Sequence, residues 1–300
     1  MKTFLKLIRV KHWIKNLFVF APLFFAKELF HFEMLTKSLI AFFSITFISV
    51  LVYIINDIID KKTDAVHKIK KERPIASGKV KPLSAFLLGL IFFIIGFLFL
   101  LLLDNASKLI IISYFILNIL YTFFFKHVTI LDVFIIAAGF CLRVLLGAIV
   151  INVTLSYWML FTTFTVSLII GFGKRRHELE FLGEEAKHHR KNFKDYNKPL
   201  LDILIIISTT LTIINYTLYT MDADIIKKFG TGGLILTVPF VIYGLFRYLL
   251  LIYCKDKGGS PEELVTNDIG LIISVVLWVI SILGFVYFKH LLNEFLFFIK

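Results

Sequence analysis

Cysteine and low-complexity sequence are nearly missing from this chain. It has 2 cysteines in 300 residues, Cys141 and Cys254, and they form no CxxC pair. Both fall in apolar segments, so a packing role is expected and disulfide or zinc sites are unsupported. The chain also has no linker, no short-period repeat and no small-residue cleavage site after its basic N-terminus. These absences predict one domain over residues 1–300 and no cleavable signal peptide.

Charged residues are scarce as well. They make up 18% of the chain against 58% hydrophobic residues, and the mean hydropathy is +0.86. Apolar runs of bilayer-spanning length recur from end to end, which predicts an all-α, polytopic membrane protein with about nine transmembrane helices. Pro22 interrupts the first run, which makes it the least regular. The expected spans lie near residues 16–33, 38–57, 82–103, 108–125, 130–151, 155–173, 200–220, 232–254 and 269–289.

The lysines and arginines gather in alternate loops. They precede the first span and recur between Lys61 and Lys81 and between Lys174 and Lys198. Because positive loops stay inside, the N-terminus and the cap loops near 58–81, 174–199 and 255–268 are expected on the cytoplasmic side of the inner membrane. Such loops are general among membrane proteins, so the net charge of +12 gives no indication of nucleic-acid binding.

A group of three carboxylates and one amide follows the apolar segment 38–55. It comprises Asn56, Asp57, Asp60 and Asp64, and the aspartates are three and four residues apart. On a helix this spacing puts them on one face. Carboxylates at a membrane rim are costly without a partner, and ion pairs with nearby lysines are one explanation. Oxygen-only ligands favour Mg²⁺, which completes its shell with substrate phosphates, so these four residues are the candidate metal ligands.

A basic tract follows the aspartates and contains Lys70, Lys71 and Arg73. A solvated positive loop would explain the lysines. Arg73 differs because Pro74 restrains the backbone after it and holds the guanidinium more firmly than a free loop would. Phosphate contact is therefore favoured for Arg73, and Lys70 and Lys71 are weaker candidates.

Further candidates for an anionic pocket lie at the edges of other spans. Lys15 and Asn16 stand where the first span begins, and Lys126 follows the fourth. Arg143 lies inside the fifth span, where a buried arginine needs a charge partner or a hydrated cavity. Asp132 is its alternative partner, and the roles of Arg247 and Asp268 stay open.

A second cationic segment ends the sixth span. It carries Lys174, Arg175 and Glu178 directly after Gly171 and Gly173, so a loop here could admit a pyrophosphate. Lys174 and Glu178 are four residues apart and could instead simply pair on a helix.

These motifs together resemble the UbiA superfamily of membrane prenyltransferases, whose first motif has an NDxxDxxxD form. Here that motif is Asn56 to Asp64, and Arg73-Pro74-Ile75-Ala76-Ser77-Gly78 follows it. The resemblance is greater to the decaprenyl-phosphate phosphoribosyltransferase branch. It covers most of the chain, with matches at residues 11–16, 18–23, 131–143, 173–179, 246–248 and 261–264.

The resemblance implies a nine-helix fold around a central cavity with cytoplasmic caps. It implies Mg²⁺-dependent transfer of 5-phosphoribose from phosphoribosyl diphosphate to a polyprenyl phosphate, with Asp57, Asp60 and Arg73 as catalytic residues, and assembly as a trimer. One departure separates the chain from the aromatic prenyltransferases, which carry a second aspartate-rich motif after the sixth span. The basic segment 174–178 stands there instead. The glycine-rich phosphate loop of soluble phosphoribosyltransferases is also missing.

Two other functions stay open at this point. A conventional prenyltransferase would use the same metal motif but would release diphosphate from the lipid. A transporter or lipid-binding protein would use the acidic residues for ions, although inverted repeats and broken mid-membrane helices are not evident in the sequence.

Overall fold

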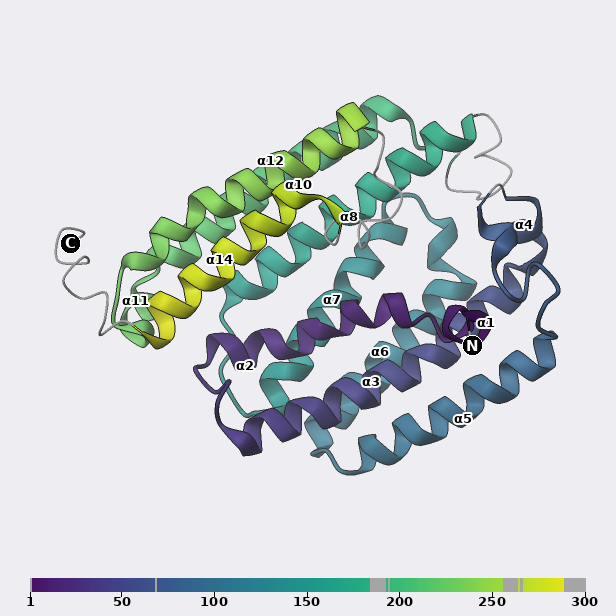
Figure 1. Cartoon of the computed structure of the whole chain (residues 1–300), viewed down its shortest axis with the longest axis horizontal. Helices are drawn as coiled ribbons and strands as arrows, with labels where there is room; N and C mark the ends of the chain where they lie inside the picture. The colour runs from purple at the N-terminus through teal and green to yellow at the C-terminus, as the bar shows by residue number, and fades with distance from the viewer. Residues whose placement is uncertain are drawn as a thin grey trace. The chain divides into compact units, whose positions relative to one another are not determined.

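The structure is a computed structural model that describes residues 2–67, 69–183, 193, 195–255, 264 and 267–288. In these ranges every regular element is a helix (Figure 1). Seven of the helices described are long and apolar enough to cross a membrane, which confirms the predicted all-α, multi-pass architecture. The chain forms two compact units: unit 1 holds residues 1–154 and 187–194, and unit 2 holds 155–186 and 195–300. One domain over the whole chain stays a prediction.

Unit 1 is built on four long helices. Pro82 at the first turn starts α5, and the Asp104 carboxylate caps α6 by accepting the backbone N–H of Ser107 at 2.8 Å. The elements are α1 (Lys2–Leu7), η1 (Val10–Phe20), α2 (Ala21–Phe25), α3 (Phe32–Ile59), α4 (Lys61–Val66), η2 (Lys70–Glu72), α5 (Pro82–Leu101), α6 (Asn105–Phe123), η3 (Phe125–His127) and α7 (Leu131–Val150).

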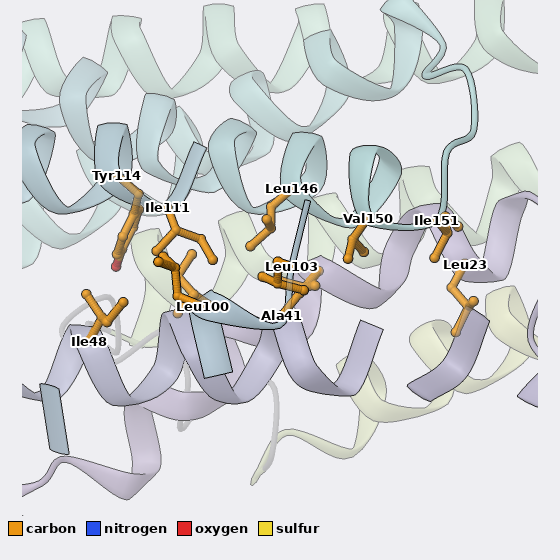
Figure 2. Packing of buried hydrophobic residues seen from close by; sticks show 12 residues of the cluster. Leu23, Ala41, Ile48, Leu100, Leu103, Ile111, Tyr114, Leu146, Val150 and Ile151 are labelled. Atoms are coloured by element: carbon orange, nitrogen blue, oxygen red, sulfur yellow. The ribbon is translucent and has the colours of Figure 1, made fainter. Parts of the chain in front are cut away.

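An apolar cluster joins α3, α6 and α7. Figure 2 shows Ile48 of α3, Ile111 and Tyr114 of α6 and Leu146 of α7 in it, all almost fully buried. Helix α5 packs against α3 through Gly96, whose backbone oxygen accepts the Ser44 hydroxyl at 2.9 Å. A side chain at Gly96 would approach the α3 backbone to 3.0 Å, so glycine allows this contact.

The first expected span, 16–33, does not form one long helix. An 11-residue 3₁₀ helix, η1, precedes the short α2, and Pro22 occupies the first turn of α2. A 3₁₀ helix of this length is unusual, because its hydrogen bonds are poorer than those of an α-helix. Arg9 precedes η1 in the left-handed region (φ 52°), and the backbone of η1 at Val19 passes directly beside Gly147 of α7. The count of nine spans is therefore approximate.

Unit 2 contains an antiparallel pair, α8 and α10. Trp158 near the start of α8 donates to Asp222 just after α10 (3.0 Å), and Arg176 near the end of α8 donates to Asp202 near the start of α10 (2.7 Å). The elements are α8 (Tyr157–Leu182), α10 (Lys198–Met221), α11 (Ala223–Phe229), η6 (Gly233–Thr237), α12 (Val238–Lys255) and α14 (Ile269–Tyr287). Residues 184–192 and 194 of the expected cap 174–199, and residues 256–263, 265 and 266 of the expected cap 255–268, fall outside the described residues.

Candidate functional site

The predicted acidic face exists in unit 1. Asn56 and Asp57 lie in the last turn of α3, and Asp60 separates α3 from α4. The backbone N–H of Asp64 still bonds to the Asp60 carbonyl at 2.8 Å, so the chain keeps nearly helical geometry across the junction. The four predicted oxygen ligands therefore lie along one nearly continuous helical segment, where their spacing puts them on a shared face.

Two arginines contact the inner pair of these carboxylates. Asp57 is 3% exposed and accepts from Arg9 and, at 3.0 Å, from Arg73. The same Nη1 atom of Arg73 donates to Asp64 at 2.6 Å. Arg73, favoured for phosphate contact, thus bridges two predicted metal ligands. The sequence gives no spacing signal for the contact of Arg9, which lies 48 positions before Asp57.

Asp60 has a different cation. Its Oδ1 accepts from Lys126 Nζ at 2.6 Å, and its Oδ2 accepts from Asn56 Nδ2 at 3.0 Å. Lys126 comes from η3 and is 5% exposed. Two predicted metal ligands and one predicted substrate contact therefore form one bonded group.

Three carboxylates and three cations thus share this cluster, which we call the charge cluster: Asp57, Asp60, Asp64, Arg9, Arg73 and Lys126. Burial raises the pKa of Asp64, and the charge of Arg73 opposes that rise. Within the described part of the chain no three acidic, histidine or cysteine side chains are arranged as a metal site. The donors themselves, carboxylates and an amide, are the hard oxygen ligands that suit Mg²⁺, and at present they face cations instead.

Arg143 occupies a separate buried network within unit 1. Its guanidinium donates to Asn16 Oδ1 (2.7 Å), the Tyr114 hydroxyl (2.7 Å) and the Gly139 carbonyl (2.8 Å). It also lies over the Tyr114 ring, 4.7 Å from the centroid. Asp132, the alternative partner, begins the same helix roughly 16 Å away along its axis, too far for an ion pair. Arg143 is thus held by neutral groups, and it fixes η1 through Asn16.

The remaining predicted contacts of unit 1 are less enclosed. Lys15 of η1 and Lys70 of η2 are half-buried, and Lys71 is exposed. Their proposed contact with substrate stays a prediction.

In unit 2, the expected loop from residue 174 is instead helix. Helix α8 continues to Leu182 because its charged turns pair internally, as in the 3.4 Å contact of Arg175 with Glu178. Both of these side chains are buried, and Lys174 is half-buried beside them. Substrate binding by Lys174, Arg175 and Glu178 stays a prediction.

Arg176 joins three helices of unit 2, and its local sequence spacing does not reveal these contacts. Besides Asp202 of α10, it donates to Glu180 (2.8 Å) and to the Ile252 carbonyl of α12 (3.4 Å), and it lies over the Tyr253 ring. The residue is 4% exposed. Only a guanidinium offers this many donors in one plane, so Arg176 stabilises the packing of α8, α10 and α12.

Replacing Arg176 by Met should destabilise the protein by roughly 2–3 kcal/mol, because two carboxylates lose their buried partner. Thermal unfolding in detergent measures this. The matched control is Lys198→Met, which removes the exposed partner of Glu180 (2.9 Å) and should cost at most about 1 kcal/mol. Equal unfolding temperatures for the two variants would contradict the role given to Arg176.

Arg247 and Asp268, whose roles were open, form a two-pronged ion pair. Arg247 Nε and Nη2 donate to the two oxygens of Asp268 at 2.9 and 3.0 Å. Asp268 also accepts the backbone N–H of Leu271 at 3.1 Å and so caps α14. The pair ties the start of α14 to α12.

The fold and the charge cluster define a helical membrane protein with a polar site at helix ends. The UbiA prenyltransferase family pattern matches residues 17–262, and the chain therefore belongs to the UbiA prenyltransferase family, which is a family of enzymes.

Two relatives show how far this similarity extends. The chain is 30% identical to a decaprenyl-phosphate phosphoribosyltransferase of Corynebacterium glutamicum, with 94% of this chain and 86% of the relative covered. It is 28% identical to an enzyme of the same name from Mycolicibacterium smegmatis, with 95% and 92% covered.

Solved structures agree on the fold. A UbiA homolog from Archaeoglobus fulgidus, bound to DMAPP and Mg²⁺, superposes with a TM-score of 0.72 at 16% identity, covering 95% of this chain and 99% of that one. A structure of digeranylgeranylglyceryl phosphate synthase gives 0.62 at 24% identity, covering 95% and 98%. At these identities the likeness establishes the architecture alone.

Proposed function

We propose that the protein is a Mg²⁺-dependent transferase that moves 5-phosphoribose from phosphoribosyl diphosphate to a polyprenyl phosphate. The C1–O bond to the diphosphate breaks, the diphosphate leaves with the electron pair, and a lipid phosphate oxygen forms the new bond to C1. The proposal rests on the charge cluster, on the basic segment 174–178 and on two relatives. Both relatives are named for this activity, and the chain matches most of the length of each.

The charge cluster suits a diphosphate because its cations can change partners. Arg9, Arg73 and Lys126 now neutralise carboxylates. Mg²⁺, when bound, would supply positive charge to those oxygens and neutralise the leaving diphosphate. Asn56, Asp57, Asp60 and Asp64 would hold it, and the released cations would turn to phosphate oxygens. Cations at these positions would stabilise the negative charge that accumulates as the C1–O bond breaks.

The acceptor needs little activation. By analogy with glycoside transfer, C1 should pass through an oxocarbenium-like state, which accepts weak nucleophiles. A phosphate monoester has a second pKa of about 6, so the lipid phosphate is already largely ionised at neutral pH. The charge cluster accordingly contains no histidine–carboxylate pair to act as a base, only carboxylates bonded to arginine, lysine or amide groups.

The sequence at the end of α8 favours phosphoribosyl diphosphate over a prenyl diphosphate as the donor substrate. An aromatic prenyltransferase is expected to place a second aspartate-rich motif there, whereas this chain has buried Arg175. A site with one acidic motif suits one metal-bound diphosphate and an anionic acceptor. Prenyl diphosphate use remains the second candidate, because a structural neighbour binds DMAPP with Mg²⁺.

Incubating the purified protein with labelled phosphoribosyl diphosphate and a panel of polyprenyl phosphates tests the proposal. A lipid-linked phosphoribose should form with Mg²⁺. Turnover should fall to background with a chelator and return with Mg²⁺, but not with Ca²⁺, which is larger and prefers more ligands. Consumption of a prenyl diphosphate with an aromatic acceptor, without lipid-linked phosphoribose, would overturn the proposal.

The same reaction tests the proposed orientation. With the N-terminus and the charge cluster facing the cytoplasm, sealed inverted vesicles should use externally added phosphoribosyl diphosphate without detergent. Turnover only in right-side-out vesicles would reverse the orientation.

A further inference from the structure

His67 lies where α4 ends, between Asp64 and Arg73 in the sequence. It is 4% exposed, and its backbone is extended (φ −80°, ψ 134°). The ring nitrogen Nδ1 accepts the backbone N–H groups of Ile69 (3.1 Å) and Lys70 (3.2 Å). Because two donors point at Nδ1, this nitrogen carries no proton and the neutral ring holds its proton on Nε2.

The turn closed by this ring leads directly to Arg73. The His67 carbonyl accepts the N–H of Lys71 (3.2 Å), and the Lys70 carbonyl accepts the N–H of Arg73 (2.9 Å). On the other side, the N–H of His67 bonds to the Asp64 carbonyl at 3.1 Å. His67 therefore joins the segment that carries Asp64 to the segment that carries Arg73.

A direct chemical role fits His67 less well. Its Nδ1 lone pair already receives two backbone donors, so this atom cannot also bind a metal or accept a substrate proton without breaking the turn. Within the part of the chain that the structure describes, His67 belongs to no metal-ligating group of three. What its position supports is control of the backbone that follows it.

We propose that His67 is a positioning residue for diphosphate binding: its Nδ1 fixes the turn Ile69–Glu72 and so keeps Arg73 beside Asp57 and Asp64, where its guanidinium can turn to a diphosphate bound there. Arg73 reaches both carboxylates with one nitrogen, so a shift of the turn would break one or both contacts. The inference deepens the proposed function and rests on it for the identity of the diphosphate.

Three substitutions separate the ring nitrogen from the ring. In His67→Asn the amide oxygen takes the place of Nδ1 and can close the same turn, as the Asn197 oxygen does for the N–H of Leu200. In His67→Gln the oxygen lies one carbon further out, near the position of Nε2. His67→Ala has no acceptor. Glu72→Gln, an exposed change in the same turn, is the control.

His67→Gln and His67→Ala should raise the KM for phosphoribosyl diphosphate about tenfold, because tenfold corresponds to about 1.4 kcal/mol and the loss of a capping acceptor destabilises the capped backbone by a similar amount. The KM for the lipid phosphate should change less than about twofold, since the cap acts on the cations around the diphosphate. His67→Asn and Glu72→Gln should resemble the wild type. Equal KM values for Asn and Gln at position 67 would overturn the proposal.

Hydrogen exchange gives a readout that needs no activity. The amides of Ile69 and Lys70 should exchange slowly in the wild type and in His67→Asn, and faster in His67→Gln and His67→Ala. If phosphoribosyl diphosphate is not a substrate, this pattern still decides whether His67 closes the turn. Faster exchange with an unchanged KM for a confirmed diphosphate substrate would overturn the positioning role, and unchanged exchange would overturn the cap itself. Should His67→Ala not fold, the Asn and Gln variants decide both points.

Discussion

Replacing Asp60 by Asn should lower kcat for the proposed phosphoribosyl transfer at least about a hundredfold, because one substitution removes both a charge of the proposed Mg²⁺ site and the partner of a buried lysine. The Asp60 carboxylate accepts from Lys126 on one oxygen and from Asn56 on the other. Asparagine keeps the shape and one oxygen, but its neutral amide binds Mg²⁺ poorly and leaves Lys126 without its carboxylate. Initial rates at saturating substrates measure the loss.

Asp104→Asn is the matched control. It makes the same chemical change at a carboxylate that caps α6, at the opposite end of that helix from η3. Asparagine caps a helix as well as aspartate does, so activity should stay within about twofold. Wild-type turnover in Asp60→Asn would remove Asp60 from the reaction.

A double substitution distinguishes metal binding from ion pairing. If Asp60 acted only as the partner of Lys126, adding Lys126→Met to Asp60→Asn should restore turnover to that of Lys126→Met alone, because no buried charge is then left unpaired. If Asp60 binds the metal, the double variant should stay as slow as Asp60→Asn at every Mg²⁺ concentration. Lys126→Met alone should then keep measurable, Mg²⁺-dependent turnover.

Local spacing predicted correctly that the three aspartates share one face. Three- and four-residue intervals placed Asp57, Asp60 and Asp64 on one face, and the helical geometry continues through the junction of α3 and α4. Hydropathy likewise predicted the long apolar helices, because a bilayer imposes a minimum length on them. Both signals depend only on residues close in sequence.

The cations of the cluster could not be assigned in the same way. Lys126 lies 66 residues from Asp60, and Arg9 lies 48 residues from Asp57. Such pairs depend on how the helices pack, and no pattern in one sequence records it. The extension of α8 past residue 174 was missed for a related reason: the charges that predicted a loop pair along the helix and stabilise it.

The sequence did not predict the 3₁₀ helix η1, whose packing against α7 depends on Gly147. A β-carbon on Gly147 would lie 2.0 Å from the backbone oxygen of Val19, far inside any allowed contact. Backbone atoms cannot rotate away as a flexible side chain can. The close approach of η1 to α7 therefore requires glycine at this position.

Gly147→Ala should accordingly destabilise the protein by about 3 kcal/mol or more, although alanine is the better helix former. The displaced η1 carries Asn16, which bonds to Arg143, so activity should fall together with stability. Thermal unfolding in detergent and turnover on the same preparation measure both effects.

Gly139→Ala in the same helix supplies the comparison. Its added β-carbon would meet its nearest neighbour, Arg143 Nη1, at 3.5 Å, an ordinary contact. The gain in helix propensity is therefore not offset, and stability should stay the same or rise by up to about 1 kcal/mol. If both alanine variants unfold at the wild-type temperature, η1 does not approach α7 as closely as the structure places it. If only Gly147→Ala is destabilised, the close approach holds η1 in place.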